Sequence, residues 1–232
     1  MTWLLLSQLN ETEHSWRIQG NTVQFGGTGT YRKLRGCDPA TFEVCTEPDC
    51  LIARDRNHVY YGAELLAAVQ RDSFAHLGEG YAADRMQAYY AGSKIQSANP
   101  LALRLLQGLY ATDGDTVFFD GKPLKGSDPQ TWREAAGEAG KHGFSHDAKH
   151  VYYCERKLPR ADTATWQHLH ETFSKDSKRV YKTNRILPDA DPVEWDTAKA
   201  AAHAAEEATR HAENSAKMSE LLKTLWQNGQ TD

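Results

Sequence analysis

Hydrophobic and polar positions recur along this chain with a fixed period. The clearest mark of the period is a seven-residue motif, in which an Asp is followed by three variable residues, an apolar residue and two aromatic residues. Copies stand at residues 55–61, 84–90, 113–119, 147–153 and 176–182, and their leading Asp residues are 29, 29, 34 and 29 positions apart. A fixed period in this range is the signature of a repeat architecture. The pattern therefore predicts stacked copies of one small unit.

The same register extends through the rest of each copy. An aliphatic residue stands seven positions after the apolar residue of the motif, and in most copies an Asp or Asn stands eleven positions after it. A large apolar residue follows at position fifteen: Phe74, Leu103, Trp132, Trp166 or Trp195. The same offsets, counted backward from Leu34, Asp38 and Phe42, predict a degenerate first copy centred near Gly27. About six units result.

Each unit contains signals for strands, a turn and a short helical segment. Val-Tyr-Tyr alternates faces as a strand does, and Asp120-Gly121 is a strong signal for a two-residue hairpin. The dipeptide Asp-Pro, as at residues 128–129, is typical of a helix N-cap followed by the first helical position. One unit cannot bury its aromatic residues alone, so neighbouring units must stack. The predicted fold is α+β, mainly β: a stacked array of about six β-hairpin/short-helix units, followed by a long C-terminal α-helix.

These motifs resemble the DKNYY repeat family, bacterial proteins of unknown function named after an Asp-Lys-Asn-Tyr-Tyr core. The resemblance rests on Asp-x-x-x-Val-Tyr-Tyr, the following Leu, and Asp-Pro with its aromatic residue, and it covers about residues 50–195. Gln70-Arg71 replaces one Asp-Pro, and Lys182 replaces the second aromatic of the last copy. The resemblance implies a fold type and no catalytic residues, because the family's signature is structural.

The C-terminal region has a different character. Residues 194–226 are rich in Ala and contain neither Pro nor Gly, which predicts a helix of about 50 Å. Its end gathers apolar residues on one side: Met218, Leu221, Leu222, Leu225 and Trp226. Such a face is expected to dock on the array, on a second copy in a homodimer, or in the groove of a partner protein. The expected domains are an N-terminal hairpin or cap (1–26), the repeat domain (27–196) and the helix (197–232).

Composition and the N-terminus limit the classes of partner. A net charge of −4 and a pI near 6.2 disfavour nucleic acid and anionic membranes, which require a concentrated basic surface. Residues 1–7 are apolar but lack the features of a signal peptide, so a first strand and a cytoplasmic location are expected. Residues 15–25 predict a hairpin that caps the array.

The residues most suited to chemistry have structural explanations. Cys37, Cys45 and Cys50 cluster in sequence, but their spacing fits no standard zinc motif, so free thiols are expected, with a metal site or a disulfide as alternatives. The repeated Asp residues stand where turns and helix N-caps need a carboxylate. His146 and His150 are expected on a turn. No cofactor, metal or catalytic residue is predicted.

Two copies carry insertions at equivalent places. Extra residues lie at 46–50 and 137–143, each between the helical segment and the next strand. Insertions in repeat arrays often lie on the binding face, although they are also tolerated as plain loops. The candidate partner-binding residues are therefore Glu47, Asp49, Lys141 and His142 in the insertions, together with the apolar residues of the helix end.

Three functional hypotheses follow from the sequence. The first is a non-enzymatic protein-binding repeat protein, specifically an immunity protein (antitoxin) that neutralises a bacterial toxin by direct binding. That specific role rests on analogy with the type of protein and on no particular residue. The second is a structural or envelope-associated repeat protein. The third is an enzyme with an unrecognised site, although the familiar motifs for nucleotide, zinc-protease and serine-hydrolase chemistry are absent from the sequence.

Overall fold

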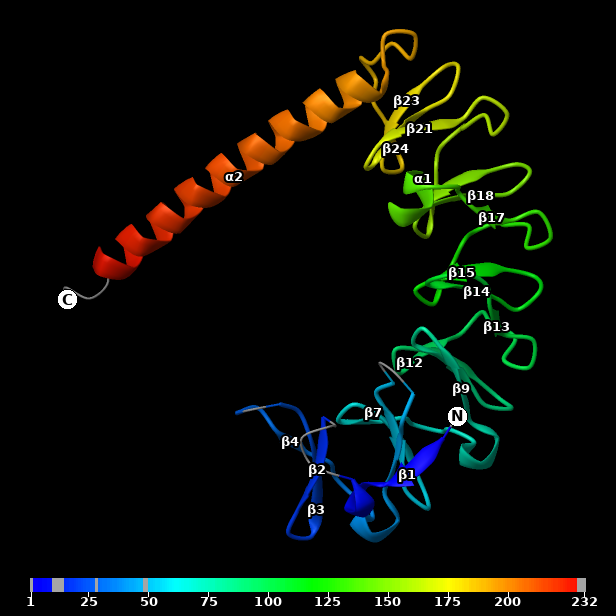
Figure 1. Cartoon of the computed structure of the whole chain (residues 1–232), viewed down its shortest axis with the longest axis vertical. Coiled ribbons are helices and arrows are strands. Elements are labelled where there is room, and N and C mark those ends of the chain that lie inside the picture. The colour runs from blue at the N-terminus through cyan, green and yellow to red at the C-terminus, as the bar shows by residue number, and fades with distance from the viewer. Residues whose placement is uncertain (1, 10–14, 28, 48–49, 229–232) are drawn as a thin grey trace. The chain divides into compact units, whose positions relative to one another are not determined.

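The computed structural model of the chain describes residues 2–9, 15–27, 29–47 and 50–228, and it is mostly β (Figure 1). It divides into two compact units, Met1–Trp132 and Arg133–Asp232. Within the described residues it contains small antiparallel sheets that follow one another in chain order, and then a long helix. The fold class predicted from the period is confirmed.

Among its placed residues, the first compact unit contains four sheets. One joins β2 (Trp16–Gln19), β3 (Thr22–Phe25) and β4 (Arg32–Lys33), and the next has the order β1 (Trp3–Leu5), β5 (Glu43–Cys45), β6 (Ile52–Arg54), β7 (Val59–Tyr61), β8 (Glu64–Leu65). The third has the order β12 (Ser93–Ile95), β11 (Ala88–Tyr90), β10 (Tyr81–Ala83), β9 (Ala75–Gly78). The fourth has the order β13 (Arg104–Leu105), β14 (Tyr110–Thr112), β15 (Val117–Phe119), β16 (Lys122–Pro123). Short 3-10 helices lie at Leu6–Gln8, Pro39–Thr41 and Arg71–Ser73.

In the described residues, the second compact unit contains two sheets and two α-helices. One sheet has the order β17 (Arg133–Glu134), β18 (Phe144–His146), β19 (Val151–Tyr153), β20 (Arg156–Lys157). The other has the order β21 (Gln167–His170), β22 (Phe173–Lys175), β23 (Val180–Lys182), β24 (Arg185–Ile186). The helices are α1 (Glu138–Lys141), which lies in the second insertion, and α2 (Thr197–Asn228).

Each complete unit of the repeat is a four-stranded meander. The motif Asp occupies the turn between the second and third strands, and Val-Tyr-Tyr forms the third strand, as in β6 and β7. A second, two-residue turn then leads to the short fourth strand. At Asp120-Gly121 both turn residues have positive φ, 49° and 71°, which is the left-handed conformation that such hairpins require. The predicted hairpin at this position is confirmed.

The degenerate first copy is centred on Val23, four residues before the predicted Gly27. The amide of Leu34 donates to the carbonyl of Val23 over 2.9 Å, as the amide of Leu66 does to that of Val59. Gln24 and Gln19 occupy the positions of Tyr and Asp, and their side chains are joined by a hydrogen bond of 2.9 Å. The sequence placed the centre of this copy too late because the connection between β3 and β4 is longer than the turn between the last two strands of the other copies. The hairpin β2–β3 thus belongs to the first sheet, which extends across the boundary expected at residue 26.

The helical segments are shorter than predicted. A crossover is the segment between two successive sheets. The crossover that begins at Asp38 starts with a 3-10 turn, and the Asp38 side chain caps this turn by accepting a hydrogen bond from the amide of Ala40. Asp128 and Asp191 accept equivalent bonds from Gln130 and Val193, but the residues after them form turns. A crossover of this length satisfies its backbone within one turn, so no longer helix forms.

The core lies between neighbouring sheets. In the first compact unit, Trp16 and Val23 of one sheet pack with Phe42, Val44 and Tyr60 of the next. Similar layers follow: Cys45, Ile52, Val59 and Leu66 pack with Ala82 and Tyr89, and Tyr81, Ala88 and Ile95 pack with Ala111 and Phe118. In the second compact unit, Phe144, Val151 and Leu158 pack with Tyr181. Every sheet therefore buries its apolar side chains against a neighbour, as stacked repeats must.

The repeated aromatic residues form the core rather than an exposed stacking platform. Those at the centre of the sheets have almost no access to solvent: Tyr60, Tyr81, Tyr110, Tyr152, Tyr181, Phe118, Phe144 and Phe173. In several copies the large residue of the crossover packs on the preceding sheet, as Trp132 does on Tyr110 with ring centroids 4.7 Å apart. These residues thus recur at fixed positions of the repeat because they pack in the core, as predicted. No helix in the described part of the chain is long and apolar enough to cross a membrane.

The turn glycine Gly121 provides a test of the stacking. A Cβ atom at Gly121 would overlap Tyr90 of the preceding sheet, whereas one at Gly108 would meet nothing within 4 Å, and both glycines have positive φ. In both variants the Ala must adopt a positive φ, which lowers the free energy of unfolding. Gly121→Ala is expected to lower it by a further 1–3 kcal/mol, roughly, because its Cβ overlaps Tyr90. Urea unfolding of the two variants measures the difference. Equal losses would contradict the packing of this turn against Tyr90.

Candidate functional site

The leading Asp of each motif copy is buried and accepts several hydrogen bonds. Asp55 has no access to solvent, and its Oδ1 accepts the amides of Asn57 and His58 over 2.8 and 2.7 Å. Its Oδ2 accepts the hydroxyl of Tyr60 over 3.0 Å and the amide of Asp38 over 2.9 Å. Asp38 begins the crossover that leads into this sheet, so one carboxylate joins the turn, the strand and the crossover.

The same arrangement recurs along the chain. The Oδ2 atoms of Asp84, Asp113 and Asp176 accept amides that begin the crossovers into their own sheets, from Gln70, Asn99 and Asp162, over 2.9, 2.9 and 3.0 Å. The Tyr hydroxyl donates to the motif Asp at Tyr89, Tyr152 and Tyr181, over 3.1, 2.9 and 2.9 Å. The Asp residues were predicted as caps of local turns, and their bond to the crossover was not foreseen.

Hydrogen bonding keeps the carboxylates of Asp55 and Asp176 charged. Burial raises the pKa of Asp55 and of Asp176, but hydrogen bonds from the backbone amides and from the Tyr hydroxyl outweigh it, so each pKa lies below its usual value. Burial, together with the adjacent carboxylate, raises the pKa of Tyr60 and of Tyr181, so these hydroxyls remain donors. A buried carboxylate with this many donors has a structural role, and this role accounts for the repeated Asp residues.

The depressed pKa of Asp55 predicts acid-dependent stability. A carboxyl whose pKa is lower in the folded state than in the unfolded state stabilises the fold above its unfolded pKa, and this contribution is lost as the pH falls through the folded pKa. Asp55→Asn is expected to cost about 2–3 kcal/mol near neutral pH and to flatten the loss of stability below about pH 5. Urea unfolding across this pH range measures both effects. Asp115→Asn, at an exposed carboxylate, is the matched control and should change stability little; equal losses in the two variants would contradict the buried role.

One motif copy lacks the hydroxyl and supplies the complementary test. Phe118 is fully buried where the other complete copies carry Tyr, beside Asp113. Phe118→Tyr is expected to add a bond to Asp113 and to stabilise the fold by about 0.5–1.5 kcal/mol, while Tyr89→Phe should destabilise it by a similar amount. Thermal unfolding of both variants checks the signs. A loss of stability in Phe118→Tyr would show that this copy has no room for the hydroxyl.

The first turns of α2 cap the last sheet. Ala200 is buried with Phe173 and Trp195, and the ring of His203 lies 5.5 Å from that of Phe173. Lys182 and Glu207 form an ion pair between β23 and the helix. The amide of Lys199 donates to the side chain of Asp196 over 2.8 Å, which caps the helix. The helix therefore packs in cis at its first turns, whereas docking in cis was expected of the apolar face near its other end.

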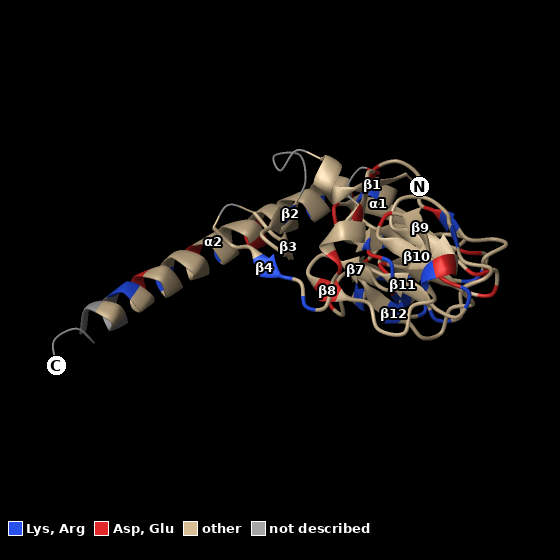
Figure 2. Cartoon of the chain, turned by 90° about the horizontal axis from the view of Figure 1, so that it is seen from below, with Lys and Arg blue, Asp and Glu red and all other residues tan. Residues whose placement is uncertain are grey.

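The far end of α2 exposes its apolar face. Met218, Leu221, Leu222 and Trp226 are 57, 53, 59 and 69 % exposed, and the side chain of Leu225 lies outside the described part. The helix carries four basic and four acidic residues, and Figure 2 shows both signs along it. Its exposed face thus offers apolar contact and no strong field of one sign.

The candidate residues in the insertions lie in different compact units. Glu47 is in the first, and its Oε2 lies 3.1 Å from Nδ1 of His76; Asp49 lies outside the described residues. Lys141 ends α1 in the second and is joined to Glu138 by an exposed ion pair of 2.6 Å. His142 stacks on His168, with ring centroids 5.9 Å apart. Part of the second insertion therefore forms a short helix, α1, and the sequence analysis had not predicted a helix there.

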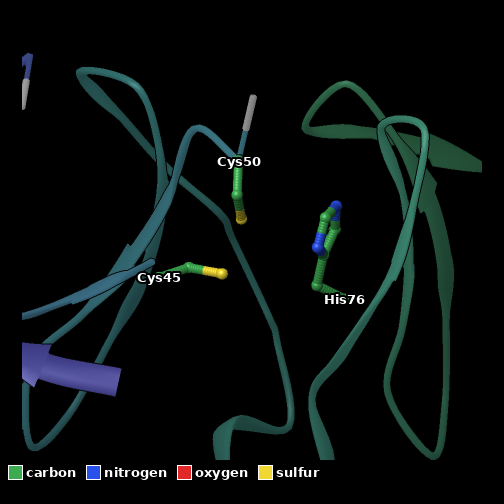
Figure 3. A group of neighbouring side chains, drawn as sticks. All are labelled: Cys45, Cys50 and His76. Atoms are coloured by element: carbon green, nitrogen blue, oxygen red, sulfur yellow. The ribbon is translucent and has the colours of Figure 1, made fainter. Parts of the chain in front are cut away.

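Two of the clustered cysteines meet a histidine that the sequence did not indicate. Cys45, at the end of β5, and Cys50 direct their sulfur atoms toward the ring of His76 on β9 (Figure 3). One ligand atom of each residue lies within 4.8 Å of those of the other two. Cys37 packs elsewhere, against the core between the first two sheets. The four cysteines are not joined in disulfides, and burial raises the pKa of the Cys50 thiol, as does the neighbouring Cys45.

Comparison with known proteins identifies the repeat. The model of the DKNYY family matches residues 16–155 and 144–223. The match includes the hairpin β2–β3 and most of α2, and so extends beyond the residues 50–195 on which the resemblance was based. No curated protein and no solved structure matches the chain.

Proposed function

The chain belongs to the DKNYY family, and we propose that it is a non-enzymatic protein-binding member that holds another protein through the exposed end of α2. The specific form that we propose is an immunity protein, which neutralises a toxin by direct binding in the cytoplasm. The observation that carries the proposal is the apolar face formed by Met218, Leu221, Leu222 and Trp226, each more than half exposed.

The two ends of α2 have different surroundings, and this difference supports the proposal. The first turns are held on the last sheet by Ala200 and by the pair of Lys182 with Glu207. The last turns carry large apolar side chains that the fold does not use. An amphipathic helix that is anchored at one end and exposed at the other can lay its apolar face into a hydrophobic groove of a second protein. Leu222 and Trp226 are one turn apart on this face and are the expected anchors.

The role of immunity protein rests on the type of protein and is a narrower proposal. A repeat array is a rigid support on which loops and a helix can be varied without altering the stack. Lys141 and His142 of the second insertion lie at the end of α1 and would give the partner a separate set of polar contacts. Polar groups at the rim of an interface mainly set the choice of partner and the association rate.

The test is a pair of variants of the intact chain. Leu222→Asp combined with Trp226→Ala is expected to abolish capture of the partner from a cell lysate and to leave the unfolding transition unchanged. Ala216→Asp places the same charge on the opposite, polar side of the helix, where the side chain is exposed, and should retain capture. Quantitative mass spectrometry of the captured proteins measures the effect.

The outcomes separate the alternatives. One stoichiometric partner, lost in the double variant alone, supports the binding function, and toxicity of that partner when it is produced without this chain supports the immunity role. Equal capture by the double variant would exclude the helix end from the interface. Sedimentation of the purified chain tests self-association: a dimer that the double variant dissociates would assign the face to a second copy and contradict the proposal.

A further inference from the structure

Cys45, Cys50 and His76 converge at the junction of two sheets. Cys45 ends β5 and Cys50 precedes β6 in one sheet, while His76 lies on β9 of the next. Cys45 is 5 % exposed and the side chain of His76 is 6 % exposed, while Cys50 is partly buried. All three belong to the first compact unit.

The repeat shows that the fold does not require these residue types. At the position of Cys45, counted from the large residue of the crossover, other copies carry apolar residues: Leu77, Leu106, Ala135 and Leu169. At the position of Cys50, counted back from the second strand, other copies carry turn residues: Glu79, Gly108, His142 and Glu171. The copies built with these other residues have the same four-stranded meander. The two thiols are therefore additions to the repeat.

The donor set and its dimensions suit a zinc-like cation. Thiolate and imidazole are the ligands that Zn²⁺ prefers, at about 2.3 Å and about 2.0–2.1 Å, so two ligands of a tetrahedral ion lie roughly 3.5–3.8 Å apart. The three ligand atoms here lie within 4.8 Å of one another. Small rotations of the side chains bring them to the required separation. A hard cation such as Mg²⁺ or Ca²⁺ would be disfavoured, since it takes oxygen ligands.

Glu47 is a hydrogen-bond partner of the His76 ring. Its Oε2 atom lies 3.1 Å from Nδ1 of His76. A carboxylate that accepts the proton of one ring nitrogen orients the imidazole and makes the other nitrogen a better ligand. The three ligands leave a fourth position of a tetrahedral ion for water.

We infer that Cys45, Cys50 and His76 bind one Zn²⁺ ion, which joins the first insertion to the following sheet, with Glu47 as a positioning residue. Binding replaces the two thiol protons, which are released to solvent, and involves no change of oxidation state. The ion bridges β9 and the segment after β5, so it stabilises the contact between these two sheets. This site is independent of the partner-binding face proposed for α2.

The test uses the intact, reduced, chelator-treated chain and Co²⁺ as a spectroscopic probe, followed by competition with Zn²⁺. One equivalent of Co²⁺ per chain is expected, with a sulfur-to-cobalt charge-transfer band and intense visible bands of a tetrahedral ion. Cys50→Ser and His76→Gln should each abolish these bands. Glu47→Gln should weaken binding by about 10–100-fold without abolishing it. Cys37→Ser and Cys154→Ser are the matched controls and should retain the full signal.

Thermal unfolding provides a readout that does not depend on the probe. An ion that binds only the folded chain raises the midpoint of unfolding, so Zn²⁺ is expected to stabilise the parent chain and not His76→Gln. Comparison of the variants without metal shows whether they fold. Absence of stoichiometric Co²⁺ binding by the parent chain, or binding that survives His76→Gln, would overturn the inference.

Discussion

The buried Asp that leads each motif copy accepts hydrogen bonds from two directions, and the arrangement of the sheets depends on it. One oxygen of Asp55 closes the turn between β6 and β7, and the other accepts the amide that begins the crossover into the same sheet. The crossover is also fixed on its other side, where Phe42 packs on Trp16 of the preceding sheet. Because a buried carboxylate is costly without donors, loss of any one of these partners weakens the hydrogen bonding that stabilises the buried charge. The crossovers that begin at Asp38 and Asp162 are thus bonded to the sheet they enter and packed on the sheet they leave.

The sequence predicted the parts of this arrangement that one unit contains. The period, the position of the aromatic core and the hairpin at Asp120-Gly121 follow from residue types and spacing, because each is set by local geometry. The bond from Asp55 to the amide of Asp38 could not be predicted in this way. It joins residues that come together only when the chain has turned into the next sheet, and an Asp that caps a turn looks the same in the sequence whether or not its second oxygen is used.

The errors have the same origin. The first copy was placed near Gly27 because Gln19 and Gln24 take the roles of Asp and Tyr, so the motif is absent although its hydrogen bond is retained. His76 was not associated with Cys45 and Cys50 because they lie in different copies and at different positions of the repeat. Ligands that converge between stacked units have no characteristic spacing in the sequence. The two proposals therefore concern features added to the repeat: an apolar helix face that the array does not cover, and a ligand cluster that the other copies do without.

Hydrogen exchange measured by NMR at the crossover amides tests the central claim most directly. The amides of Asp38, Gln70 and Asn99 lie outside the strands, yet each donates to a buried carboxylate of the sheet that follows. They are expected to exchange as slowly as the amides of the central strands. The amide of Leu101 donates to the exposed side chain of Asn99, and it should exchange rapidly. Rapid exchange at all three crossover amides would contradict the account, because the sheets would then be held together without the buried Asp residues.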